Sequence, residues 1–210
     1  MNRNDTSVLG GCSRKLLHTL AVVLTIGVAM AAAGAARAQD AAACVQRIGA
    51  DTLQAAQSGT AQAFYAVVDK HADTQQIALF ALGQYRRLLT PDRQQEYVRL
   101  VERFIAQTLA DNYRKFRASD LKVTGAKPQG ESVNVETTLI FLGGRPSQKV
   151  IWRVVPATCK VIDVNVTNVW LGQLLRTSIT SAIQKGGQTI NAAFVFLQPS
   201  QGVTDVKVNR

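Results

Sequence analysis

The hydrophobic period of the chain changes after Asp120, and this change constrains the fold more than any other feature of the sequence. Beyond that residue four segments are rich in Val, Thr and Ile, and the second alternates apolar and polar positions as a half-buried strand does. These segments are residues 121–125, 132–142, 148–155 and 160–167, joined by connectors at 127–130, 143–146 and 156–158. Because such short connectors force neighbouring strands to run antiparallel, the sequence predicts a four-stranded antiparallel meander.

On either side of the meander, apolar residues recur at the three-and-four spacing of one helix face. Thr90 and Pro91 end one such segment and begin another, with Thr90 as the N-cap and Pro91 at the first helical position. The predicted helices are residues 41–57, 61–70, 73–88, 91–117, 171–185 and 189–197. We therefore expect an α+β domain in which helices pack on one face of a curved sheet.

The amino terminus has the form of a cleaved export signal. Arg14 and Lys15 precede an uncharged apolar run, and Ala36-Arg37-Ala38 has the small-x-small form of a signal-peptidase site. A membrane anchor is the less favoured interpretation, because the run is rich in Ala and Gly and ends in that cleavage site. We expect a signal peptide at 1–38, a single domain at 39–197 and a loosely ordered tail at 198–210.

Export determines how the charge and the cysteines are interpreted. The exported part keeps a basic balance, so nucleic acid is not expected as a partner, whereas lipid head groups and acidic proteins are. Cys44 and Cys159 are the two cysteines that remain after residue 38, in a compartment that permits disulfides, and they are candidates for a bridge.

The segment 91–117 predicts a long amphipathic helix with a basic face. At 100° per residue, one arc holds the apolar positions and the opposite side holds Arg99, Arg103, Arg114 and Arg117. Two interpretations of these arginines stay open. They form a solvated surface, or they contact anionic head groups or an acidic partner.

The residue inventory offers little for catalysis. His71 is the single histidine beyond residue 38, and its polar surroundings predict an exposed position. No metal-binding or phosphate-binding motif occurs, so neither a metal nor a cofactor is expected. Asp163 stands between apolar neighbours and could act as a general base if burial raised its pKa, although a hydrogen-bonded structural role is favoured. Trp152 and Trp170 could stack on bases or sugars, but tryptophan side chains more commonly pack in a core, so core packing is favoured.

Several segments together resemble the MlaC / toluene-tolerance family of periplasmic phospholipid carriers. The resemblance rests on Leu82-Gly83 with Tyr85, Thr90-Pro91, Tyr113, Val123-Thr124-Gly125, Trp152, Ile162-Asp163-Val164, Arg176 and Ile183 before Gly186-Gly187, in this order and spacing. It implies a cone-shaped fold similar to nuclear transport factor 2. It also implies a non-enzymatic role in outer-membrane lipid asymmetry, with phospholipid as ligand. The partners it implies are an outer-membrane lipoprotein complex and an inner-membrane ABC lipid transporter complex.

The chain departs from the family pattern at Arg86, where an aromatic residue is usual, and at Asn168-Val169-Trp170, where Gly-Val-Ser is usual. The expected lipid-binding residues are Phe80, Tyr85, Val98, Val101, Phe104, Ile105, Leu109, Tyr113, Val133, Val135, Leu139, Trp152, Val164, Trp170, Leu175 and Ile179. The alternatives are a periplasmic enzyme of the same fold with Asp163 as base, and a structural adaptor whose apolar interior is filled by its own side chains.

Overall fold

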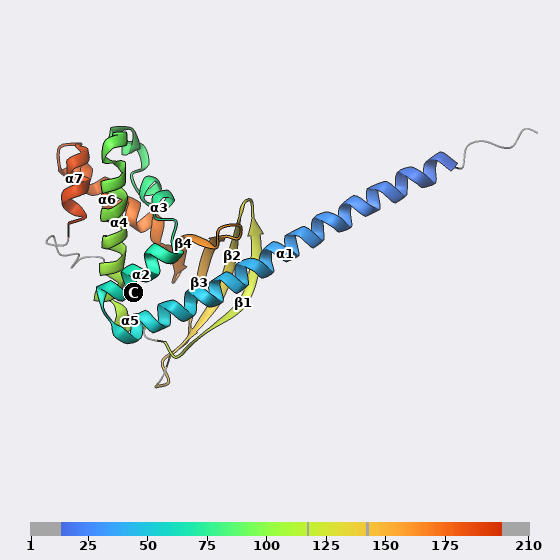
Figure 1. Cartoon of the computed structure of the whole chain (residues 1–210), viewed down its shortest axis with the longest axis horizontal. Coiled ribbons are helices and arrows are strands. Elements are labelled where there is room, and N and C mark those ends of the chain that lie inside the picture. The colour runs from blue at the N-terminus through green and yellow to red at the C-terminus, as the bar shows by residue number, and fades with distance from the viewer. Residues whose placement is uncertain (1–13, 117, 142, 199–210) are drawn as a thin grey trace, which may run out of the picture. The chain divides into compact units, whose positions relative to one another are not determined.

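The computed structural model describes residues 14–116, 118–141 and 143–198, and the chain divides into two units, 1–36 and 37–210. Helix α1, Arg14–Ser58, contains the boundary between them, and only its part from residue 37 onward belongs to the second unit (Figure 1). The expected signal-peptide cleavage after Ala38 falls two residues beyond this boundary and stays a prediction. Most of the expected tail, residues 199–210, lies outside the described residues.

In the described part of the chain, six helices and one 3₁₀ segment follow α1. They are α2 Ala61–His71, α3 Thr74–Ala81, η1 Gly83–Leu88, α4 Pro91–Asp111, α5 Tyr113–Phe116, α6 Leu171–Lys185 and α7 Ile190–Phe196. The side chains of Thr60 and Asp73 cap α2 and α3 by accepting hydrogen bonds from the backbone N–H groups of Ala63 and Gln76. Thr90 occupies the N-cap position of α4 as predicted, but its side chain makes no capping hydrogen bond.

Two of the predicted helices are interrupted. The helix expected over 73–88 ends at Ala81, because Gly83 has a left-handed backbone (φ +55°) that ordinary helix residues avoid. The helix expected over 91–117 ends at Asp111, where the backbone and side-chain N–H groups of Asn112 both donate to the Thr108 carbonyl.

The sheet has five antiparallel strands in sequential order, one more than predicted. The strands are β1 Asp120–Gln129, β2 Ser132–Ile140, β3 Gln148–Val155, β4 Lys160–Val166 and β5 Val169–Trp170. Strand β5 returns on β4 through Thr167 and Asn168, whose φ angles of 49° and 64° are those of a tight two-residue hairpin turn. The sequence lacks the usual glycine at that turn, which explains why the fifth strand was not predicted.

Within residues 37–210 the apolar residues form separate cores. One lies among the helices α3, α4, α6 and α7, where Tyr97, Leu82 and Ile179 are fully buried. A second packs α1 onto the sheet, with Val45 and Ile48 against Val133 and Val135. In the ranges that the structure describes, no helix is both long enough and apolar enough to cross a membrane.

Candidate functional site

A cavity of about 270 Å³ lies between the sheet and the helices, and its walls are almost entirely apolar. Helices α1, α2, α3, α4 and α6 contribute one side of it, and strands β1, β2, β3 and β4 contribute the other. Most of its side chains are half-buried, in contrast to the fully buried residues of the helical core. An opening of this kind, apolar and accessible from water, suits a ligand with a long hydrocarbon part.

The structure brings seven of the sixteen predicted lipid-binding residues together in this cavity. They are Phe104, Ile105, Leu109, Leu139, Trp152, Val164 and Leu175. The Trp152 ring is fixed in the wall because its indole Nε1 donates to Thr137 Oγ1, 3.0 Å away on the neighbouring strand. These seven residues come from α4, α6, β2, β3 and β4.

Six of the predicted residues belong to the packed cores instead. Tyr85, Val101 and Ile179 are buried in the helical core, and Val98 packs against it. Val133 and Val135 point from β2 into the interface between α1 and the sheet, where both have no exposed surface. The helical period and the strand alternation identified these residues as apolar and inward-facing, but a packed core and a cavity wall share that pattern.

The other three predicted residues do not line the cavity either. The Phe80 ring is 44 % exposed and lies 5.3 Å from the Arg176 guanidinium. Tyr113 packs beside Gly59 in the contact between α2 and α4. Trp170 stacks against Arg153 on β3, with the guanidinium carbon 4.0 Å from the ring centroid.

Sequence reasoning missed the walls that α1 and α2 contribute. These are Ile48, Gly49, Thr52 and Leu53 from α1, and Phe64, Val67, Val68 and His71 from α2. Both helices were predicted, and the three-and-four spacing of Ile48, Thr52, Phe64 and Val68 was the available signal. That spacing indicates an inward helix face, but a packed core face and a cavity wall share it, so it does not by itself assign these residues to a cavity.

His71 is buried, which corrects the expectation that it lies exposed. It is 8 % exposed, lines the cavity, and its Nε2 is 2.7 Å from Asp51 Oδ2 on α1. Lys70 Nζ donates to the same carboxylate oxygen at 2.8 Å. The hydrogen bonds from Lys70 and His71 lower the pKa of Asp51, so this pair of contacts ties the end of α2 to α1.

Asp163 also lines the cavity, but its carboxylate is engaged by the backbone. Oδ1 accepts hydrogen bonds from the N–H groups of Val164, at 2.8 Å, and Gly172, at 2.9 Å in the first turn of α6. Burial raises the pKa of Asp163, while these two hydrogen bonds and the Arg153 charge oppose the shift. A carboxylate held at a helix start in this way favours the structural role over the general base.

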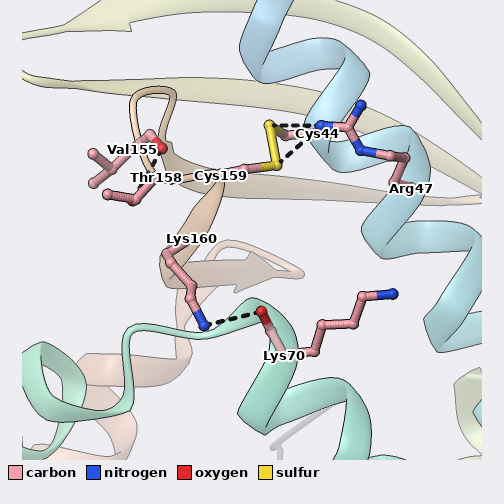
Figure 2. Close-up of a disulfide and its surroundings, with 7 residues drawn as sticks. All are labelled: Cys44, Arg47, Lys70, Val155, Thr158, Cys159 and Lys160. Carbon is pink, nitrogen blue, oxygen red and sulfur yellow. Dashed lines mark hydrogen bonds between the residues drawn. A yellow bond between two sulfur atoms is a disulfide. The ribbon is translucent and has the colours of Figure 1, made fainter.

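The two cysteines form a disulfide between α1 and the turn after β3. The Cα atoms of Cys44 and Cys159 lie 5.6 Å apart, within the usual range for a disulfide. Figure 2 shows the Arg47 guanidinium of α1 reaching both sulfur atoms.

The predicted basic face is exposed where the structure describes it. Arg99 and Arg103 lie on the solvent side of α4, and Arg114 of α5 is exposed beside the Tyr113 ring. Arg117 lies outside the described residues. In the described part of the chain no group of His, Cys, Asp and Glu side chains could hold a metal ion.

Comparison with known proteins identifies the family. Comparison with curated proteins finds no match. Among solved structures, the phospholipid-binding protein from Ralstonia solanacearum, solved in complex with a phospholipid, superposes with a TM-score of 0.63. The two chains are 21 % identical over 75 % of this chain and 94 % of that one, a likeness that shows a common fold. The family model described as MlaC protein matches residues 38–194, and the chain belongs to the MlaC family.

Proposed function

We propose that this protein is a periplasmic carrier that holds phospholipid acyl chains in the cavity and moves lipid between the two membranes for an ABC-type transport system. The observation that carries the proposal is the apolar cavity between sheet and helices in a chain of the MlaC family. The phospholipid bound to the structurally similar Ralstonia protein supports the ligand class.

The physical need for such a cavity follows from the cost of exposing hydrocarbon. A sixteen-carbon acyl chain in water costs roughly 13 kcal/mol at about 0.8 kcal/mol per methylene, so a lipid crosses an aqueous compartment only inside an apolar shelter. The cavity supplies one, with Thr52, His71, Thr108, Asp163 and Ser178 as its few polar residues.

The size of the cavity bears on how loading proceeds. At about 270 Å³ it lies just below the roughly 300–1,000 Å³ typical of pockets for drug-sized ligands. Two acyl chains exceed such a ligand, so the walls must move apart when a diacyl lipid enters. The half-buried side chains of Phe104, Leu109 and Leu174 can move more readily than the close-packed core residues.

The compartment and partners form the second part of the proposal. Cleavage of residues 1–38 would release residues 39–210 into the periplasm, where the basic side chains of Arg99, Arg103 and Arg114 would meet anionic head groups or an acidic partner complex. The ABC transporter and the outer-membrane lipoprotein complex are the partners that the family resemblance implies.

A pair of matched substitutions on α4 tests the proposal. Thr108→Glu places a carboxylate in the cavity wall, and Gln95→Glu adds the same charge at an exposed position of the same helix. After incubation with phospholipid vesicles, we expect Gln95→Glu to retain as much lipid as the unmodified protein and Thr108→Glu to retain at least about tenfold less. Equal lipid retention by the two folded variants would contradict the proposal.

A further inference from the structure

The Cys44–Cys159 disulfide presents its two sulfur atoms differently to solvent. Cys44 lies on α1 and is 3 % exposed, within the contact between that helix and the sheet. Cys159 closes the turn between β3 and β4, is partly exposed, and has a left-handed backbone with φ 54°. A reagent in solution therefore reaches the Cys159 sulfur more readily than the Cys44 sulfur.

A permanent positive charge stands beside both sulfur atoms. Arg47, three residues after Cys44 on α1, places Nη2 3.4 Å from Cys44 Sγ and 3.3 Å from Cys159 Sγ (Figure 2). A guanidinium cannot lose its proton at physiological pH, and it stabilises whichever sulfur carries negative charge. In thiol–disulfide exchange, stabilising the departing thiolate speeds the reaction.

The disulfide is also connected to the cavity wall at both ends. Ile48 follows Cys44 by one helical turn and Val161 follows Cys159 by two residues, and both line the cavity. Between them, Lys160 Nζ donates to the Asp69 carbonyl and to the Lys70 carbonyl at the end of α2, and Figure 2 shows the second of these hydrogen bonds. Lys70 and His71, at the end of α2, in turn contact Asp51 on α1.

These contacts form a closed ring from α1 through the disulfide to β4, on to α2 and back to α1. The disulfide is the covalent cross-link in this ring. The two noncovalent links are the hydrogen bonds that Lys160 donates to α2 and the contacts of Asp51 with Lys70 and His71. Among the described residues, opening the disulfide leaves the α1 turn around Cys44 and Val45 held to the sheet by apolar packing and by the Arg47 contact with Cys159 Sγ.

We propose that the Cys44–Cys159 disulfide is a site of thiol–disulfide exchange whose co-reactant is a protein dithiol, and that its reduction loosens the α1 wall of the cavity. Cys159 Sγ is the attacked atom, Cys44 is the leaving group, and Arg47 stabilises the Cys44 thiolate as it departs. The consequence for the cavity rests on the proposed lipid-carrying function, whereas the exchange chemistry does not.

The reaction balances as an ordinary two-electron exchange. A thiolate of the dithiol attacks Cys159 Sγ and forms a mixed disulfide, while the bond to Cys44 breaks and its electron pair leaves on Cys44 Sγ. The second thiol of the dithiol then attacks its own sulfur in the mixed disulfide and releases the Cys159 thiolate. Two protons pass from the dithiol to Cys44 and Cys159, so the protein is reduced and the dithiol is oxidised.

The role of Arg47 is tested by the rate of reduction. We expect Arg47→Gln to slow reduction by dithiothreitol by about tenfold under native conditions, as followed by alkylation and intact mass, because the leaving thiolate loses its charged neighbour. Arg99→Gln removes the same charge from a distant exposed site on α4 and should leave the rate unchanged. Equal rates for the two variants would overturn the assignment of Arg47.

The attacked atom is tested by trapping the mixed disulfide with glutathione, a monothiol. After rapid alkylation, peptide mass spectrometry should find glutathione on Cys159 and the alkyl group on Cys44. Glutathione on Cys44, or no mixed disulfide in the folded protein, would overturn the proposed chemistry.

The link to the cavity is tested on lipid-loaded protein before and after reduction by dithiothreitol. We expect the reduced protein to lose lipid to acceptor vesicles several-fold faster than the oxidised protein, and the Cys44→Ser/Cys159→Ser variant to match the reduced protein with or without dithiothreitol. Equal loss from the oxidised and reduced proteins would overturn the link to the cavity. If no lipid is bound in either state, the carrier function fails, while the rate and trapping experiments still decide the exchange chemistry.

Discussion

Helix α4 contributes to two apolar regions that share a composition and differ in packing. Toward α6 and α7 it presents Tyr97 and Val101, which have no exposed surface. Around the cavity it presents Phe104, Ile105 and Leu109, which stay half-buried, although the Phe104 ring also packs on Phe196 of α7 with its centroid 5.4 Å away. The difference shows that residue type does not decide between a core and a binding site. What decides is whether the opposite element interdigitates with the helix or stands away from it.

Truncating one residue in each region gives the largest expected effect and tests this comparison directly. Ile179→Ala in the helical core should lower the free energy of unfolding by about 2–5 kcal/mol, because it leaves a cavity among fully buried neighbours. Leu174→Ala in the cavity wall should cost roughly 1 kcal/mol, since part of that side chain already meets open space. Urea unfolding of both variants measures the two losses in free energy of unfolding and therefore their ratio.

A cost for Leu174→Ala as large as that for Ile179→Ala would break the comparison. It would mean that the region between α6 and the sheet is close-packed, as a structural adaptor with a filled interior requires.

The exposed arginines of α4 and α5 give the next expected effect. Reversing charge at Arg99, Arg103 and Arg114 together should slow lipid transfer to anionic vesicles by about tenfold at low salt, with little change in lipid retention or thermal stability. The effect should fade as ionic strength rises, because salt screens exposed charges. Transfer at the normal rate at low salt would show that this face is only a solvated surface.

Glu102 gives the smallest expected effect, on stability alone. It is 7 % exposed on α4, and its Oε1 has no hydrogen-bond partner in the described part of the chain. Burial, with the nearby Asp69 carboxylate, raises the pKa of Glu102 above its usual value. The folded state therefore binds this proton more tightly than the unfolded state, and stability falls as pH rises from the usual carboxyl range through the folded pKa.

Glu102→Gln should consequently raise the thermal midpoint by a few degrees at pH 7.5, and the gain should disappear as pH falls below the usual carboxyl range. Glu96→Gln, on an exposed position of the same helix, serves as the control and should change the midpoint little. A lower midpoint for Glu102→Gln at pH 7.5 would show that the ionised carboxylate stabilises α4, and differential scanning calorimetry across pH decides between the two.

The sequence predicted the architecture better than the site, for a physical reason. Strand alternation around Val133 and Val135 and the spacing of α4 identified each inward face, because burial imposes a period on either element. That period could not show that Val135 meets α1 while Leu139 and Trp152 meet the cavity, since this depends on where other elements sit.

The misplaced residues share the same cause. His71 was expected to be exposed because its neighbours along the chain are polar, but Asp51 supplies its partner from twenty residues away. The interruption at Gly83 was missed because a glycine in a helical pattern indicates a break only when its φ is known. The pairing of Cys44 with Cys159 was easier to anticipate, because no other cysteine follows residue 38.

Native mass spectrometry of the mature protein, purified without detergent, tests the central claim most directly. We expect a species whose mass exceeds that of residues 39–210 by one diacyl phospholipid. Thr108→Glu should show this species far less, and Gln95→Glu should show it unchanged. A protein that carries no lipid, and takes none up from phospholipid vesicles, would contradict the claim that the space between sheet and helices is a lipid cavity.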